Sequence, residues 1–128
     1  MIILLDTNVL VWLLEGGAML SKQAKSQLES AEAVYASAIN IVELRIKSML
    51  SKISIPETLF EDIKAAGLEV LPFTADHAEA LGKFPELSRH DPFDRMLLAQ
   101  ASVDDMYFLT SDQVLIDLGQ NFVLSARS

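Results

Sequence analysis

Short apolar runs alternate along the chain with segments in which apolar residues recur at the spacing of a helix. The strands that this pattern predicts are Ile2–Leu5, Ala33–Tyr35, Glu69–Leu71, Tyr107–Thr110 and Phe122–Val123. The helices that it predicts cover residues 7–14, 21–31, 37–50, 56–67, 74–83, 91–104 and 112–118. The first strand is apolar throughout, as is typical of a parallel strand that is buried on both faces.

Strands that alternate with helices of this length indicate an α/β fold with a parallel sheet. Right-handed crossovers then place helices on both faces of the sheet. The length of 128 residues suits one domain, spanning residues 1–128. In such folds ligands bind beyond the carboxyl ends of the strands. Residues that directly follow a strand are therefore the first candidates for chemistry.

Two aspartates follow predicted strands. Asp6 comes directly after the first strand, and Asp112 follows residues 107–110 after one serine. Because the carboxyl ends of parallel strands meet at one edge, we expect both side chains there. Each aspartate also stands where a helix begins, and an Asp N-cap stabilises a helix by about 1 kcal/mol. Capping alone is thus an alternative explanation for either residue.

Two further aspartates flank Pro92 at the start of a predicted helix. Asp91 suits the N-cap, and negative charge in a first turn interacts favourably with the helix dipole. Capping explains Asp94 less well, because Asp91 can already satisfy the exposed amides. We therefore expect Asp94 to face a ligand.

Glu43 lies in the middle of the predicted helix over 37–50, with apolar residues on nearly every side. A buried, unpaired Glu is costly. The alternative is a surface ion pair with Lys47, which stabilises a helix by only about 0.2–0.5 kcal/mol.

Taken together, the four carboxylates favour a ligand site over helix capping and a surface ion pair. Clustered carboxylates repel one another unless a cation neutralises them. Oxygen ligands suit hard ions such as Mg²⁺ or Mn²⁺. Such ions activate water and stabilise the leaving oxygen in phosphodiester hydrolysis. The pattern therefore predicts a metal-dependent nuclease built on Asp6, Glu43, Asp94 and Asp112.

The charge distribution limits the kind of partner. The net charge is −8, and residues 57–128 hold 13 acidic and five basic residues, which is the whole acidic excess. Such a chain should bind bare phosphate backbones poorly, which argues against a nucleic-acid-coating module. We expect a basic partner instead. An Arg of this partner would enter the acidic site, pair with the carboxylates and displace the metal.

Composition also indicates a compartment. The absence of cysteine fits a reducing cytoplasm. The longest apolar run, Val9–Leu14, is too short to span a bilayer, and Met1 leads into a strand without a basic signal region. We expect a cytoplasmic protein with no membrane segment.

The motifs resemble those of PIN-domain ribonucleases, specifically the VapC-type toxins of toxin–antitoxin pairs. They occur in family order with family-like spacing over nearly the whole chain. The matching segments are Leu5-Asp6-Thr7-Asn8, Ser37 to Glu43, His90-Asp91-Pro92-Phe93-Asp94-Arg95, Ala99-Gln100-Ala101 and Thr110-Ser111-Asp112.

This resemblance implies a three-layer α/β/α sandwich with a mainly parallel five-stranded sheet in the order 3-2-1-4-5. It implies an endoribonuclease that binds Mg²⁺ or Mn²⁺ at the four carboxylates, with Asp91 assisting them. It also implies a homodimer that a cognate antitoxin holds inactive.

Supporting roles are expected for several neighbours. Thr7 and Asn8 are expected to orient Asp6 through hydrogen bonds. Thr110 and Ser111 are expected to do the same for Asp112. The remaining expectations are a phosphate contact for Arg95, a loop or supporting role for His90, a surface position for His77, and core positions for Trp12, Phe73 and Phe93.

Two other functions remain open on the residues alone. An aspartyl-phosphate phosphatase would use Asp6 as its nucleophile, but it needs an acid where Asn8 stands and has no use for Glu43. A non-enzymatic partner-binding domain with a relic metal pocket is the other alternative. An activity assay distinguishes it from a nuclease.

Overall fold

The computed structural model describes residues 1–127 and contains one five-stranded sheet in the order β3-β2-β1-β4-β5. All four neighbouring pairs run parallel, which confirms the predicted α/β fold and strand order. The strands are β1 (Ile2–Leu5), β2 (Ala33–Ser37), β3 (Glu69–Leu71), β4 (Tyr107–Thr110) and β5 (Val123–Ser125).

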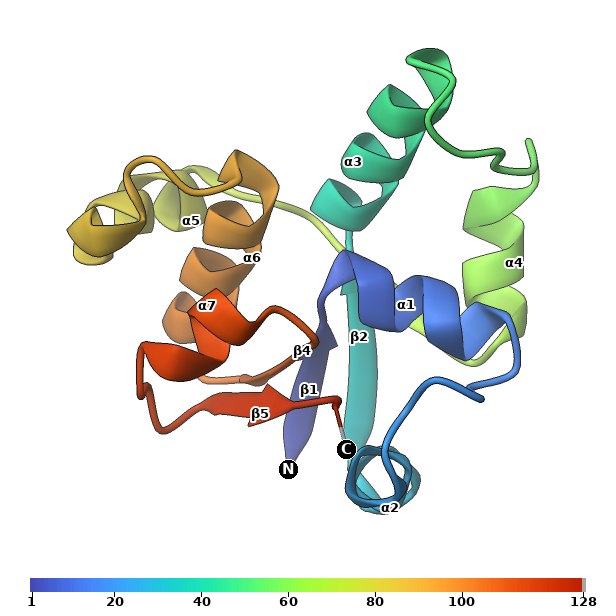
Figure 1. Cartoon of the computed structure of the whole chain (residues 1–128), viewed down its shortest axis with the longest axis horizontal. Coiled ribbons are helices and arrows are strands. Elements are labelled where there is room, and N and C mark those ends of the chain that lie inside the picture. The colour runs from blue at the N-terminus through green and yellow to red at the C-terminus, as the bar shows by residue number, and fades with distance from the viewer. Residues whose placement is uncertain (128) are drawn as a thin grey trace.

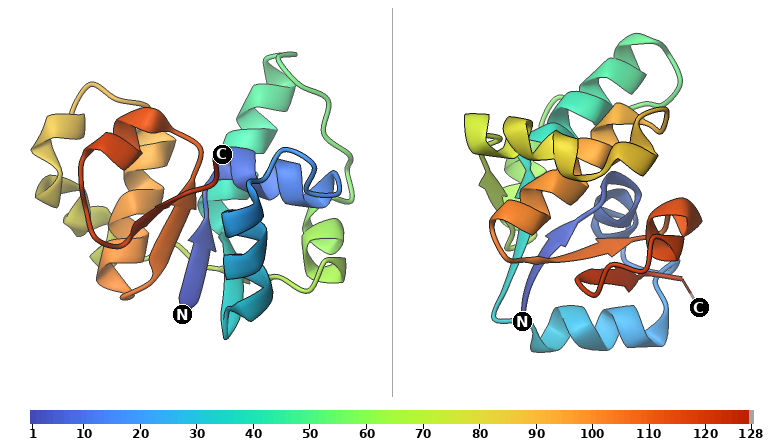
Figure 2. Two further views of the ribbon diagram at one scale, coloured as in Figure 1. Left: turned by 60° about the horizontal axis from the view of Figure 1, so that its bottom comes forward. Right: turned by 90° about the vertical axis from the view of Figure 1, so that its left-hand side faces the viewer.

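Helices cover both faces of the sheet. The α-helices are α1 (Thr7–Leu14), α2 (Lys22–Ser30), α3 (Ala38–Met49), α4 (Leu59–Ala65), α5 (Ala75–Glu79), α6 (Pro92–Val103) and α7 (Gln113–Asp117). Two 3₁₀ helices, η1 (Ala80–Lys83) and η2 (Pro85–Leu87), follow α5. Figure 1 shows α1 and α4 on one side of β1 and β2, and α5, α6 and α7 on the other, an arrangement that Figure 2 shows from two further directions.

Alternate side chains of each strand enter two separate cores. In β1, Ile3 and Leu5 pack with residues of α1, α2 and α4, whereas Leu4 packs with residues of α6 and α7. All three are fully buried. The alternation follows from the two-residue period of a strand, and it produces the three layers that the family resemblance implies.

The helix α3 lies over the carboxyl edge of the sheet and joins both cores. Its Leu44 belongs to the core under α1 and α4, and its Ile39 to the core under α6. Figure 1 shows α1 and α3 leaving the ends of β1 and β2 side by side. This edge therefore collects residues from several elements.

No helix in residues 1–127 is long and apolar enough to cross a membrane.

Two predicted helices differ from the structure. Pro56 begins a tight turn, in which the Leu59 amide donates to the Pro56 carbonyl at 3.2 Å, so α4 starts three residues later than predicted. The predicted helix over 74–83 ends as an α-helix at Glu79. Pro85 disfavours helical backbone in the residue before it, and Phe84 accordingly leaves the helical region.

Candidate metal centre

Asp6 connects the end of β1 to the start of α1. Its Oδ1 accepts a hydrogen bond from the Asn8 amide at 2.7 Å, and its Oδ2 accepts one from the Thr110 hydroxyl. The residue is only 3% exposed. Burial raises the pKa of Asp6, and these hydrogen bonds only partly oppose the shift.

Asp112 occupies the corresponding position beside Asp6. Leu5 of β1 pairs with Leu109 of β4, so the two strands end side by side. Asp112 caps α7 through Oδ1, which accepts from the Val114 amide at 2.9 Å, while Oδ2 lies 2.9 Å from Nε2 of His90. Helix capping and a place in the acidic cluster thus coexist, because each uses a different oxygen.

Asp94 lies in the first turn of α6, close to Asp112. Asp91 caps this helix by accepting from the Phe93 amide at 2.8 Å, as its position predicts. Burial, the negative charge of Asp6 and the hydrogen bond with Asp112 raise the pKa of Asp94 to about 8. Asp94 therefore holds a proton at neutral pH.

The shared proton leaves Asp112 charged. Burial alone would raise the pKa of Asp112, but hydrogen bonds from Asp94, the Val114 amide and His90 outweigh it and lower the pKa. The two aspartates behave as one coupled acid.

Glu43 projects from α3 into the same region and is held at both oxygens. Oε1 accepts from the Thr7 hydroxyl at 2.7 Å, and Oε2 lies 2.5 Å from the Lys47 ammonium. The Glu43–Lys47 pair therefore exists, but not at the surface: the side chains are 4% and 34% exposed. Burial lowers the pKa of Lys47, but its hydrogen bond with Glu43 and nearby negative charges outweigh this and raise the pKa.

A buried amide links these residues and was not among the predicted site residues. Nδ2 of Asn40 donates to the Thr7 hydroxyl at 3.0 Å and to the Leu5 carbonyl at 3.2 Å. Its Oδ1 accepts from the Ser37 amide at 2.7 Å, which completes the capping box of α3. Asn40 stands three residues after Ser37 and on the same helix stripe as Glu43. This spacing could have identified Asn40 as a capping-box residue close to the site.

Thr7 has a different partner from the one predicted, and Thr110 has a second partner besides Asp112. Thr7 holds Glu43 rather than Asp6, and Asn8 contributes its backbone amide to Asp6 while its side chain is exposed. The Thr110 hydroxyl donates to Asp6, although it also accepts from the Asp112 amide at 3.0 Å. The Ser111 backbone also forms a hydrogen bond with the Asp6 carboxylate.

Arg95 is not turned towards the acidic cluster. Its guanidinium donates to the Leu81 carbonyl in η1 at 3.1 Å. Position next to Asp94 in the sequence thus does not bring the two side chains together, because successive helix residues point in different directions.

The two histidines differ in role. His90, in the loop before α6, lies between Asp94 and Asp112. His77 is 4% exposed, which corrects its expected surface position. It stands three residues after the N-cap Thr74 and closes that capping box, and its Nε2 lies 2.9 Å from Asp104. The Thr74-to-His77 spacing was the signal for this role.

The cluster suits a hard divalent cation. The charge of Glu43 raises the pKa of both Asp6 and Asp94, and Asp6 does the same to Asp94, so the carboxylates share one electrostatic environment. The donors facing it include carboxylate oxygens, which Mg²⁺ and Mn²⁺ prefer. Ligand atoms of Asp94, Asp112 and His90 lie within 4.8 Å of one another. In the metal-free cluster Lys47 and the proton on Asp94 offset part of the negative charge.

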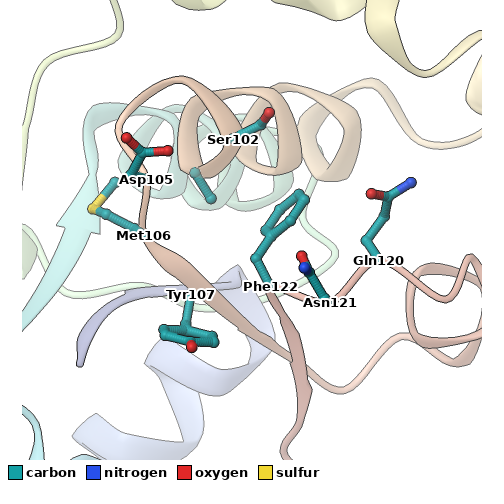
Figure 3. A pocket seen from close by; sticks show the side chains of 8 residues that line it. Ser102, Asp105, Met106, Tyr107, Gln120, Asn121 and Phe122 are labelled. Carbon is teal, nitrogen blue, oxygen red and sulfur yellow. The ribbon is translucent and has the colours of Figure 1, made fainter.

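A hollow elsewhere on the molecule is not part of this centre. It has a volume of about 550 Å³ and lies between the end of α6, the start of β4 and residues 120–122. Figure 3 shows Tyr107, Asp105 and Phe122 among its lining side chains. Tyr107 begins β4, whereas Asp112 follows its end, so the hollow is at the opposite edge of the sheet.

Comparisons with known proteins agree with the fold. The sequence profile of the PIN domain matches residues 3–120. None of the curated proteins compared with the chain matches it.

Several solved structures share the fold. VapBC2 from Rickettsia felis bound to a DNA fragment from its promoter is 18% identical, with a TM-score of 0.69 over 100% of this chain and 99% of that one. DNA-bound VapBC from Salmonella typhimurium is 20% identical, with a TM-score of 0.67 over 96% of each chain. FitAcB from Neisseria gonorrhoeae is 25% identical, with a TM-score of 0.58 over 87% of this chain and 88% of that one.

Proposed function

The chain belongs to the PIN-domain family, and from that membership we propose that it is an endoribonuclease that hydrolyses RNA phosphodiester bonds with Mg²⁺ or Mn²⁺. The observation that supports this proposal is that the charges of Asp6 and Glu43 act on Asp94, which forms a hydrogen bond with Asp112. The proton held by Asp94 supports it, because a cation would take that proton's place.

Each acid has a distinct part in this proposal. The bound ion would activate water and stabilise charge at the phosphate. Asp94 and Asp112 would hold it at the mouth of the site, and Asp94 would give up its proton on binding. Asp6 would hold it from beneath, fixed by Thr110. Glu43 would complete the site in an orientation fixed by Thr7 and Lys47.

Asp91 would assist from the rim. Its carboxylate caps α6 and its charge acts on both Asp94 and Lys47. Arg95 is a weaker candidate for a phosphate contact than the sequence indicates, since its guanidinium donates to Leu81. Lys47 has a partly exposed side chain, its ammonium lies beside Glu43, and it is the better candidate.

We further propose that the protein is the toxin of a toxin–antitoxin pair and works in the cytoplasm as a homodimer. Structures that share its fold are toxin–antitoxin complexes, including one from Klebsiella pneumoniae. Exposed apolar side chains on α3, at Val42, Ile46 and Met49, support protein partners close to the site. The partner we expect is a small antitoxin with an Arg-bearing segment that pairs with the carboxylates.

The test is cleavage of a panel of structured and unstructured RNAs by the purified protein, with Mn²⁺ or Mg²⁺ and with chelator. We expect cleavage only with metal. Glu43→Gln and Asp6→Asn keep the shapes of the side chains but remove charge, and should lower the rate by about two orders of magnitude or more. Glu29→Gln, an exposed glutamate on α2, is the matched control and should leave the rate unchanged.

Equal cleavage by all four proteins in chelator would overturn the nuclease assignment. Metal binding without cleavage of any RNA would instead favour a partner-binding domain that keeps the metal pocket.

A further inference from the structure

His90 places its imidazole between two of the acids, Asp94 and Asp112. It lies just before the N-cap of α6, and its amide donates to the Leu87 carbonyl at 2.9 Å, which fixes the loop. Its side chain is 21% exposed. The imidazole therefore faces the open side of the cluster, from which an ion and its waters could enter.

The distances around the imidazole match those between neighbouring ligands of a metal ion. Nε2 lies 2.9 Å from Oδ2 of Asp112 and 3.3 Å from Oδ2 of Asp94. Two ligands that bind an ion at right angles, each about 2.1 Å from it, are about 3.0 Å apart. One ligand atom from each of the three residues lies within 4.8 Å of the others. A single ion can therefore contact all three.

In the metal-free protein these three atoms contact one another, and an ion would lie between them. Oδ1 of Asp112 is used by the cap of α7, so Oδ2 is the oxygen that faces His90. Within residues 1–127, the imidazole's hydrogen-bond partners are these two carboxylates. The ring is thus held by the same oxygens that would share the ion with it.

We propose that His90, in the neutral tautomer that carries its hydrogen on Nδ1, supplies Nε2 as a ligand to the ion that Asp94 and Asp112 bind, and that the centre therefore takes Mn²⁺ in preference to Mg²⁺. The proposal rests on the metal-dependent function argued above and specifies its cofactor. Mg²⁺ strongly favours oxygen ligands, whereas first-row transition ions also accept imidazole nitrogen. A site with one imidazole and carboxylates should discriminate between them.

The test is electron spin-echo spectroscopy of Mn²⁺ bound to the full chain, because coupling to a directly bound nitrogen identifies the ligand. The chain has two histidines, and the other, His77, is paired with Asp104. We expect nitrogen coupling in the unmodified protein and its loss in His90→Gln, which keeps a hydrogen-bond donor.

Calorimetry with each metal alone provides the second measurement. His90→Gln should weaken Mn²⁺ binding by about tenfold or more, and Mg²⁺ binding by much less. Arg89→Gln, which changes the exposed neighbour, should leave both affinities and the nitrogen coupling as they are.

Mn²⁺ bound without nitrogen coupling would overturn the proposal, even if His90→Gln fails to fold, since the unmodified protein alone decides this point. Equal losses of Mn²⁺ and Mg²⁺ affinity would also contradict it. If Mn²⁺ binds with nitrogen coupling but no RNA is cleaved, the ligand assignment stands and the ribonuclease function fails. If neither ion binds, both fail.

Discussion

Two of the aspartates that begin helices, Asp6 and Asp112, divide their carboxylate oxygens between two tasks. Asp6 and Asp112 each use Oδ1 to accept from a helix amide and direct Oδ2 elsewhere, to Thr110 and to His90. A cap of this kind fixes the side chain on the rigid end of a helix. The same bond that stabilises the helix therefore orients the second oxygen in the cluster.

Asp94 should make the stability of the metal-free protein depend on pH. Its ordinary pKa of 3.8 is raised to about 8 in the folded chain. Between these values the folded protein holds a proton that the unfolded chain has released, so the free energy of unfolding falls as pH rises. Asp94→Asn removes this proton exchange. In urea unfolding with chelator, the variant should be more stable at neutral pH and less sensitive to pH between about 4 and 8.

The matched control is Asp105→Asn, an exposed aspartate outside the cluster, which should keep the pH dependence of the original. Mn²⁺ at one hundred times its dissociation constant should stabilise the unmodified protein by about 2.7 kcal/mol. The same Mn²⁺ concentration should stabilise Asp94→Asn much less. If Asp94→Asn is simply less stable at every pH, with no metal response in either protein, then Asp94 serves only the helix.

The elements that carry the four acids could be predicted from sequence, but most of the hydrogen-bond partners of these acids could not. Position after a strand or at a helix start indicated Asp6, Asp94 and Asp112. The partners of Thr7 and Thr110 depend on how α3 and β4 pack against β1, a relation between distant segments. Thr7 therefore contacts Glu43, 36 residues away, and not its neighbour Asp6.

At the scale of elements, the apolar pattern predicted strands better than helix ends. The bounds of β1, β3 and β4 agree with the prediction. A polar residue follows β1 and β4, and Pro72 follows β3. Helix starts depend on capping geometry, and Ser21 and Ser37 were recognised as caps by residue type. The start of α4 was not, since Thr58 makes no side-chain cap there.

Asn40 should contribute both to the stability of the fold around α3 and to metal binding at the site. Asn40→Ala would leave the Ser37 amide and the Leu5 carbonyl without these hydrogen bonds, and would release Thr7 from one side. An unsatisfied buried polar group costs about 1–3 kcal/mol. We expect the free energy of unfolding to fall by about 2–4 kcal/mol in urea titration, and the remaining folded protein to bind Mn²⁺ more weakly.

Gln23→Ala, on the exposed face of α2, should change stability by less than about 0.5 kcal/mol. An Asn40→Ala protein as stable as the original, with unchanged Mn²⁺ affinity, would show that α3 holds Glu43 without this amide.

At the scale of the whole molecule, the charge of −8 favours a basic partner. The toxin proposal requires a small basic protein encoded beside this chain, and co-expression with it should yield a complex that does not cleave RNA. Electrostatic attraction speeds association and is screened by salt, so the association rate should fall as ionic strength rises in stopped-flow measurements. Asp94→Asn should weaken the complex by removing a partner of the inserted Arg. Harmless expression of the chain alone in its host, with no co-purifying protein, would contradict the toxin assignment.

The central claim is that one acidic cluster both binds the metal and cleaves RNA. The most direct measurement is the RNA cleavage rate as a function of Mn²⁺ concentration, compared with Mn²⁺ binding to the same preparation. We expect the two curves to have the same midpoint, and Asp94→Asn to move both to higher Mn²⁺ concentration. Cleavage that persists in chelator, or an Asp94→Asn protein whose binding is weakened while its cleavage curve stays in place, would contradict the claim.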